Sequence, residues 1–449
     1  MPYLFLLAAA LSLIAAPAPA RADAIDRVVA DQMAVSCIPG AAVAVVEQGR
    51  VVKLAAYGVA DVEWNAPVDL DTRFQLASAT KIFTGVLLMR LVEQGRLGLD
   101  DPLTRWFPDA PASWAGIRVR QLADHTSGLP DDLGTPAPQT VEGVVAAAIK
   151  RPLAYQPGTE ARYGFTDFTV LRAVIEKAGG KKLPDLLRDE VTAPLGMTAT
   201  GFALAAEEDG VRVGAVLPKR AETYGLRDGE LVTSDFFFAP HGYGAGGLYS
   251  SIRDLAAFFA ALDQGRVLRR ESLVALETPA TLPGGKRSGF GVGWIARTYR
   301  GVPVVGHSGG PALADILRVE DRRLTVIALT NQRTFFPLLA EALLDRYVPA
   351  PPEPAAIEDR TPQSTARVRA ALEAAAAGRP ATGVSPNVAG QLGSPFARAL
   401  LKGVGPLAAF SLVGEEGSTR RYRATFQRKR MTWLAESDDQ GVITRLRPE

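Results

Sequence analysis

The stretch FQLASATKIFTGVLLMRLVEQGRLGL, residues 74–99, decides the fold. Ser78 stands three residues ahead of Lys81, so both side chains lie on one face of a helix. Residues 82–92 are apolar nearly all round, which predicts a helix buried in a large core, and Gly95 ends it. A hydroxyl and an amine at the positive end of a buried helix suit a nucleophile and its base, because burial and the N-terminal field both favour the neutral amine.

The composition predicts a globular chain with a large domain and a smaller one, since 47% of the 449 residues are hydrophobic. Fifty basic and 48 acidic residues leave a formal charge of +2, without a basic block or an arginine stripe, which excludes nucleic-acid binding. The single Cys37 excludes an internal disulfide, and three histidines without zinc-ligand spacing argue against a metal site. We expect no metal and no organic cofactor.

The N-terminus reads as a secretory signal peptide over residues 1–22. An apolar run over residues 3–16 is followed by Ala-x-Ala sites that end at Ala20 or Ala22. The run is too short for a comfortable membrane span. We therefore expect a periplasmic or secreted chain without a stable membrane span after signal removal; the alternative is an uncleaved N-terminal membrane anchor.

Strand-like segments lie at both ends of a long helical region. Two β-rich runs, residues 41–47 and 51–58, precede the Ser78 helix, and four more follow between residues 293 and 331 as an antiparallel meander. Between them the pattern stays helical up to residue 263, with helices over 166–178 and 253–263. This predicts an α/β (α+β) fold, in which one antiparallel sheet from sequence-distant halves is flanked by helices, with an all-helical subdomain beside it.

The domain boundaries follow from changes in composition. A large domain is expected over residues 23–348 and a Pro-rich linker over residues 349–363. Residues 364–449 then suggest a small α+β accessory domain, with helices over 366–377 and 395–403 followed by four strands. This accessory domain contains no residue that we single out for chemistry.

Ser-x-x-Lys alone is common, so Ser78 and Lys81 indicate a catalytic site only when further motifs accompany them. They occur in this order: FQLASATK, RLVEQGRLGLDDPL, QLADHTSGLP, PGTEARYGFTDFTVL, APLGMTATGF, GAGGLYSSIRDLAAF and GHSGG. Over residues 24–347 the chain resembles the penicillin-recognising serine hydrolases, in the branch of class C β-lactamases, D,D-peptidases, D-aminopeptidases and esterases. The resemblance implies a β-lactamase/transpeptidase-like fold and hydrolysis through an acyl-enzyme.

The resemblance also implies roles for three residues. Ser78 would be the acylated nucleophile, and Lys81 would take or relay its proton. Tyr163 matches the tyrosine of the family's Tyr-x-Asn element, whose phenol would move protons between nucleophile, leaving group and water. The alternative for Tyr163 is a core tyrosine that caps a loop.

A second implied part of the site is the strand that carries His307, Ser308 and Gly309, where lactamases of the family have Lys-Thr-Gly and several esterases and aminopeptidases have His. His307 would orient Tyr163 or a substrate carbonyl and titrate near neutrality; the alternative is a histidine hydrogen-bonded at a strand end. Substrate would lie along Ser308 and Gly309. The backbone N–H groups of Ser78 and Gly310 would form the oxyanion hole.

The sequence departs from the family pattern at Phe165, which stands where the Asn of Tyr-x-Asn is expected. An Asn amide would hydrogen-bond the side-chain amide of the substrate, whereas Phe165 offers apolar surface and leaves such a group unpaired. This favours esters or unusual amides over β-lactams. Thr166 or Asp167 would substitute for the Asn if the loop register differs.

His125 and His241 also lie in glycine-containing loops. We interpret each as a loop histidine bonded to backbone, because no acidic partner sits at a recognisable spacing.

The expected function is a secreted serine hydrolase that is acylated on Ser78 and acts on carboxylic esters or small D-amino-acid amides. One alternative substrate is a β-lactam or a cell-wall peptide, as for a β-lactamase or D,D-carboxypeptidase. An alternative of another class is a non-catalytic ligand-binding sensor that keeps the pocket. We expect a monomer whose partner is a small-molecule ester, amide or peptide.

Overall fold

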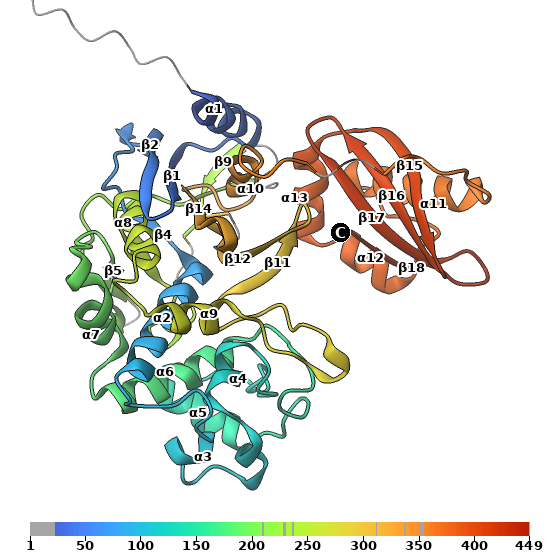
Figure 1. Cartoon of the computed structure of the whole chain (residues 1–449). Coiled ribbons are helices and arrows are strands. Elements are labelled where there is room, and N and C mark those ends of the chain that lie inside the picture. The colour runs from blue at the N-terminus through green and yellow to red at the C-terminus, as the bar shows by residue number, and fades with distance from the viewer. Residues whose placement is uncertain are drawn as a thin grey trace, which may run out of the picture.

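The structure is a computed structural model that describes residues 23–208, 211–227, 230–235, 238–310, 312–335, 338–350, 352 and 354–448. The predicted signal peptide, residues 1–22, lies outside the described residues. Figure 1 shows an N-terminal body with strands in its upper part and helices in its lower part, and a C-terminal unit to its side.

The centre of the body is a seven-stranded sheet within the described residues, in the order β11-β12-β13-β14-β1-β2-β3. Its strands are β1 (Gly40–Glu47), β2 (Arg50–Asp61), β3 (Ala66–Pro67), β11 (Ile295–Tyr299), β12 (Val302–Gly309), β13 (Ala314–Val319) and β14 (Leu324–Thr330). All neighbours are antiparallel, and β1 pairs with β14 so that Ala41 lies opposite Thr330. This confirms the prediction of one antiparallel sheet assembled from distant parts of the chain.

Strand β1 is buried on both faces because its side chains alternate between two apolar clusters. Ala41, Val43 and Val45 join the cluster that contains helices α1 (Ala24–Ser36) and α10 (Leu339–Leu344). The intervening residues of β1 join the larger cluster, which contains α2 (Thr80–Glu93) and α8 (Ile252–Asp263). The continuous apolar run in the sequence is therefore explained by helices on both sides of the sheet.

Helix α2 begins at Thr80, two residues after Ser78, and is buried over most of its length, as its apolar sequence predicts. Gly95, with φ of +69°, takes the left-handed conformation that ends the helical segment. The other helices of the body are α3 (Leu103–Trp106), α4 (Val119–Ala123), α5 (Val141–Ile149), α6 (Phe165–Gly179), α7 (Leu183–Leu187) and α9 (Arg270–Glu277). Helix α6 packs against both α2 and α5, which places the loop before α6 beside the start of α2.

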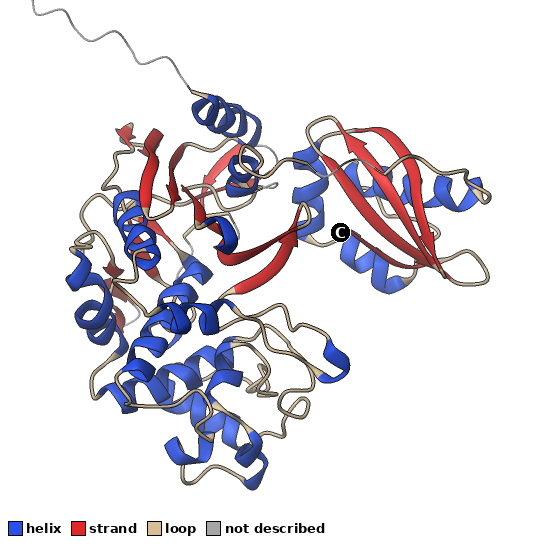
Figure 2. Cartoon of the chain, in the orientation of Figure 1, coloured by secondary structure: helices blue, strands red, loops and turns tan. Residues whose placement is uncertain are grey.

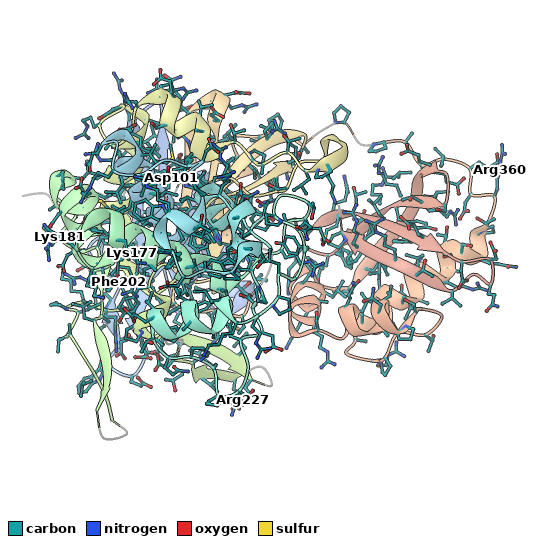
Figure 3. The ribbon with its side chains drawn as sticks, turned by 90° about the horizontal axis from the view of Figure 1, so that it is seen from below. Asp101, Lys177, Lys181, Phe202, Arg227 and Arg360 are labelled. Carbon is teal, nitrogen blue, oxygen red and sulfur yellow. The ribbon has the colours of Figure 1, made fainter. Side chains whose placement is uncertain are left out.

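The region before α8 contains strands, so the expectation of an unbroken helical period there is wrong. A small sheet has the order β4-β10-β5, and two hairpins, β6–β7 and β8–β9, lie nearby in sequence. The bounds are β4 (Phe74–Gln75), β5 (Gly201–Phe202), β6 (Ala205–Glu208), β7 (Val211–Gly214), β8 (Tyr224–Arg227), β9 (Glu230–Thr233) and β10 (Leu248–Ser250). Strands of two to four residues are too short to show alternation. Figure 3 shows the β6–β7 hairpin extending away from the body.

The C-terminal unit has its own apolar cluster, formed by residues between 368 and 446. It contains α11 (Pro362–Ala376), α12 (Pro386–Leu392), α13 (Pro395–Val404) and the sheet β15 (Leu407–Glu416), β16 (Thr419–Phe426), β17 (Arg430–Ser437) and β18 (Ile443–Pro448), with helices against the sheet (Figure 2). The four predicted strands are confirmed, whereas α12 was missed. An ion pair of 2.7 Å between Lys429 and Glu341 of α10 joins the unit to the body. The predicted domain boundaries stay predictions.

Two further observations concern helices of the body. After β14, helix α10 covers Leu339–Leu344, and residues 336–337 lie outside the description. In the described part of the chain, no helix combines the length and the hydropathy that crossing a membrane would require.

Candidate active site

Ser78 lies in a short turn, Ala77–Ala79, that connects β4 to α2. The preceding residue, Ala77, has φ of +45°, in the left-handed region that residues other than glycine rarely adopt. Such backbone strain is concentrated at functional sites. Ser78 itself is partly exposed, so its hydroxyl is presented at the end of a buried helix.

Lys81 is almost completely buried, with 2% of its surface exposed. Its Nζ donates hydrogen bonds to the Tyr163 hydroxyl at 2.7 Å and to the Ala245 carbonyl oxygen at 2.8 Å. Burial lowers the pKa of Lys81 to about 7, although the nearby charge of Asp131 opposes the shift. A substantial fraction of this lysine is therefore a neutral amine at neutral pH.

Tyr163 brings the helical part of the body to the nucleophile. The residue as a whole is 47% exposed, while its hydroxyl bonds to the buried Lys81. Burial raises the pKa of the phenol, and a hydrogen bond with Ser78 lowers it. The structure thus brings Ser78, Lys81 and Tyr163 together around one phenolic oxygen, although 82 residues separate the lysine from the tyrosine.

Strand β12 borders the nucleophile through Gly309. A Cβ atom added there would lie 3.0 Å from the Ser78 backbone nitrogen and would collide with the Leu76 carbonyl oxygen. Only a glycine permits this approach. Because Gly309 lies against Leu76 and Ser78, the segments that carry the two predicted oxyanion donors, Ser78 and Gly310, are in contact. Gly310 itself has φ of +87°.

His307 is buried on β12, and its ring centre lies 6.0 Å from that of Tyr163. Its Nδ1 lies 2.6 Å from the Ser308 carbonyl oxygen, which can only accept, so Nδ1 carries the proton. Burial and the proximity of Lys81 lower the pKa of His307 to about 3. The expectation that His307 titrates near neutrality is therefore wrong: it is a neutral imidazole with Nε2 unprotonated.

Phe165 is the first residue of α6 and keeps 37% of its surface exposed. Its ring meets His241 edge to face at 5.7 Å, and a Cβ atom at Gly242 would lie 2.9 Å from it. The two suggested substitutes for the missing Asn point elsewhere: Thr166 is buried, and Asp167 hydrogen-bonds His125 and Ser127. An aromatic pair, Phe165 and His241, therefore stands where the family pattern has an Asn amide.

His125 has an acidic partner after all. Its Nδ1 lies 3.0 Å from Oδ2 of Asp167, 42 residues away in sequence, and both side chains are buried. The interpretation of His125 as a loop histidine bonded to backbone holds for its contact with the Gly164 N–H at 3.3 Å, but the expectation that it has no acidic partner is wrong. The pairing had no sequence signal, because it depends on how the HTSGL loop folds against α6.

Asp131 is a further residue that the sequence did not indicate. Its carboxylate accepts hydrogen bonds from the N–H groups of Phe165 at 2.9 Å and Thr166 at 2.8 Å, at the start of α6. A capping carboxylate normally comes from the residue just before the helix, which here is Gly164. Asp131 reaches this position from a distant loop and adds a negative charge near Lys81.

A cavity of about 980 Å³ is distinct from this constellation. It lies beside β2, β3, β4 and β10, with Trp64, Gln75 and Tyr249 among its walls. Ser78 is not among its described lining residues. The chemistry of the side chains, rather than cavity size, therefore locates the site.

A hydroxyl, a buried amine of lowered pKa and a phenol that accepts a hydrogen bond from that amine are the parts of a catalytic site of the Ser-x-x-Lys class. The chain belongs to the Beta-lactamase family, whose model matches residues 25–347. The predicted family and the β-lactamase/transpeptidase-like fold are both confirmed.

Among curated proteins, the chain is 30% identical over 304 residues to Penicillin-binding protein 4* of Bacillus subtilis, a match that covers 64% of this chain and 66% of that protein. It is 28% identical over 187 residues to Protein flp of Staphylococcus aureus, covering 40% of this chain and 38% of flp. The chain thus spans less than two thirds of the length of these relatives.

Among solved structures, the chain is similar to the D-amino acid amidase of Ochrobactrum anthropi SV3 complexed with L-phenylalanine amide. The identity is 27% and the TM-score 0.60, over 72% of this chain and 97% of the amidase. An octameric penicillin-binding protein homologue from Pyrococcus abyssi, at 22% identity and a TM-score of 0.61, shares the fold over 92% of this chain and 90% of its own. That coverage exceeds residues 1–348, so the shared fold extends into the C-terminal unit. The predicted monomer stays a prediction.

Proposed function

We propose that the protein hydrolyses small carboxylic esters and amides, D-amino-acid amides among them, through an acyl-enzyme on Ser78. One observation carries the proposal: the Tyr163 hydroxyl accepts a hydrogen bond from Lys81 at 2.7 Å, and the Ser78 hydroxyl is near enough to lower the pKa of that phenol. A proton can therefore pass between nucleophile and amine through a single oxygen.

Acylation begins with Lys81 and Tyr163 sharing one proton. When Lys81 holds it as an ammonium, the Tyr163 phenolate accepts the proton of Ser78, and the Ser78 oxygen bonds to the substrate carbonyl carbon. The carbonyl oxygen becomes an oxyanion that the N–H groups of Ser78 and Gly310 stabilise. When the tetrahedral intermediate collapses, the bond to the leaving group breaks and the Tyr163 phenol gives its proton to the departing amine or alkoxide.

Deacylation uses the same groups in reverse. A water molecule gives a proton to the Tyr163 phenolate, and its oxygen bonds to the acyl carbon. The bond to Ser78 then breaks, Ser78 regains the proton from Tyr163, and the carboxylic acid leaves. His307, neutral and protonated on Nδ1, takes no proton in this cycle and presents Nε2 as a hydrogen-bond acceptor.

The aromatic side chains around the site favour substrates with apolar acyl groups. Phe165 and His241 form one edge-to-face pair, and Phe290 lies 6.1 Å from Tyr163. Such a surface buries an aromatic or branched side chain of the substrate, but it offers no hydrogen-bond partner to a secondary amide of the substrate. The similarity to an amidase that was solved with phenylalanine amide supports the same class of substrate. Secretion, supported by the apolar N-terminal run, belongs to the proposal as well.

The test uses the purified chain from residue 23 onward. A fluorophosphonate probe should label Ser78, as mapped by mass spectrometry, and p-nitrophenyl esters and D-phenylalanine amide should be hydrolysed. Ser78→Ala should abolish labelling and turnover, whereas Ser437→Ala, a partly exposed serine in the C-terminal unit, should leave both unchanged. Label on another residue, or turnover that survives Ser78→Ala, would overturn the proposal.

The relative named Penicillin-binding protein 4* favours a second candidate, hydrolysis of a β-lactam or cell-wall peptide. Nitrocefin turnover that exceeds ester turnover would select it. Ligand binding without any covalent adduct would instead favour a non-catalytic sensor.

A further inference from the structure

His125 holds the backbone on both sides of Tyr163. The Arg162 N–H donates to the His125 carbonyl oxygen at 3.0 Å, and the Gly164 N–H donates to His125 Nδ1 at 3.3 Å. The imidazole also packs on the Tyr163 ring, with ring centres 4.7 Å apart. One residue therefore restrains the chain before, at and after the phenol.

His125 is itself held firmly. Its φ of +59° is in the left-handed region, and the Tyr155 hydroxyl donates to its carbonyl oxygen at 3.0 Å. On the ring side, Nδ1 lies 3.0 Å from Asp167 Oδ2, and the Ser127 hydroxyl donates to Asp167 Oδ1. Asp167 lies on α6, so the contact also ties the HTSGL loop to the helix that follows Tyr163.

The hydrogen-bond pattern assigns the proton between the two side chains. Because the Gly164 N–H donates to Nδ1, that nitrogen presents its lone pair, and Asp167 must supply the proton for their contact. Burial agrees with this: it raises the pKa of Asp167 well above its usual range and lowers the pKa of His125 to about 3. The pair is neutral.

We propose that His125 and Asp167 are a neutral positioning pair that keeps the Tyr163 hydroxyl against Lys81 and Ser78. Tyr163 needs such support, since nearly half of its surface is exposed and Gly164, which follows it, restrains the backbone least of all residues. Displacing a catalytic group by about 1 Å costs about 100-fold in rate. The inference rests on the proposed function, in which Tyr163 moves the proton.

Two pairs of variants test the inference. Asp167→Asn keeps a donor for His125 and an acceptor for Ser127, so it should retain kcat within about threefold; Asp167→Leu removes both and should lower kcat about 100-fold. His125→Asn keeps a residue type that tolerates a positive φ but loses the ring against Tyr163, and should also lower kcat about 100-fold. KM should stay within about threefold, because the pair does not touch substrate.

The pH profile distinguishes positioning from simple stability. Lys81 is faced by Tyr163, His125, His307 and the charge of Asp131. When Tyr163 withdraws and water replaces it, Lys81 regains basicity, so the acid limb of kcat/KM in His125→Asn and Asp167→Leu should move to higher pH. Asp254→Asn, a buried carboxyl bonded to Ala199 and Thr200, is the control and should not move it.

All rates are expressed per labelled Ser78 site. Absence of label and of turnover in the wild-type chain would overturn the proposed function, whereas a labelled, active wild type with unchanged variants would overturn this inference alone. It would also be overturned if Asp167→Asn were as damaging as Asp167→Leu. If Asp167→Leu fails to fold, Ser127→Ala replaces it and should lower kcat about tenfold; unchanged kcat would again overturn the inference.

Discussion

The Nζ atom of Lys81 lies 2.7 Å from the hydroxyl oxygen of Tyr163 and 2.8 Å from the carbonyl oxygen of Ala245. These two acceptors match the two N–H bonds of a neutral amine, whereas an ammonium has three N–H bonds to satisfy. The geometry therefore agrees with the lowered pKa of this lysine, and it leaves the amine a lone pair for the proton of the nucleophile.

The first prediction concerns the pH dependence of activity. Since burial lowers the pKa of Lys81 to about 7, kcat/KM should rise about tenfold per pH unit below pH 7 and become constant above it. No fall is expected at moderately alkaline pH, because burial raises the pKa of Tyr163. Initial rates of p-nitrophenyl ester hydrolysis, measured from about pH 5 to about pH 9, give this pH profile. Lys81→Met should lower kcat/KM about 1000-fold; a profile without an acid limb near 7 would contradict the assignment.

The second prediction concerns Gly309. A side chain there would push against Leu76 and the Ser78 backbone nitrogen, so Gly309→Ala should displace the nucleophile and lower the acylation rate about 100-fold. Stopped-flow measurement of probe labelling gives this rate. Gly201→Ala is the matched control, because a Cβ at Gly201 meets no atom within 4 Å, and it should label at the wild-type rate. Equal rates for both variants would exclude the close approach.

The third prediction concerns substrate choice at Phe165. Phe165→Asn replaces the apolar wall beside His241 by an amide that can bond the side-chain amide of a β-lactam or peptide. The ratio of nitrocefin to ester kcat/KM should rise about tenfold, as one hydrogen bond to a substrate amide would give. Parallel assays of the wild-type chain and the variant measure it. A ratio that falls or stays constant would show that residue 165 does not contact the substrate amide.

The fourth prediction concerns stability and pH. Asp315 is completely buried on β13, and its Oδ2 has no hydrogen-bond partner among the described residues. Burial raises its pKa from 3.8 to about 7, so between these values the folded chain holds a proton that the unfolded chain has released. Its contribution to stability is present below about pH 4 and is lost as pH rises through 7, by at most about 4 kcal/mol.

Urea unfolding of the wild type and of Asp315→Asn, at about pH 5 and about pH 8, tests the fourth prediction, because these values lie on either side of the folded-state pKa. The variant should lose less stability than the wild type between the two values. Asp100→Asn, in which the replaced carboxyl is largely exposed, should retain the wild-type difference. A parallel loss in all three proteins would contradict a protonated Asp315.

The fifth prediction concerns a buried ion cluster around Arg318 on β13, the strand next to β12. Arg318 donates to Glu277 at 2.7 Å and to Asp263 at 2.6 Å, and all three side chains are buried. Arg318→Met leaves two buried carboxyl groups without a cation and should destabilise the chain by about 3–5 kcal/mol in urea unfolding. Arg105→Met, which breaks an exposed pair with Asp101, should cost less than about 1 kcal/mol. Similar losses would contradict the difference in burial.

Local sequence was sufficient for most of the fold. The apolar run of β1, the all-round apolar α2 and the turn residues between β11 and β14 each show the pattern of their element, so their limits were predicted closely. The strands between residues 201 and 250 were missed, because each is two to four residues long and pairs with distant partners. Their formation depends on the surrounding body rather than on a local pattern.

The sequence by itself determined that Ser78 precedes a buried lysine by one helical turn, because that relationship is local. It also determined the ordered motifs that identify the family. Tertiary structure alone decided that Asp167 pairs with His125, that Asp131 caps α6 and that His307 is neutral. Those properties depend on burial and on contacts between segments far apart in the chain, and neither has a period or a spacing that can be read along the sequence.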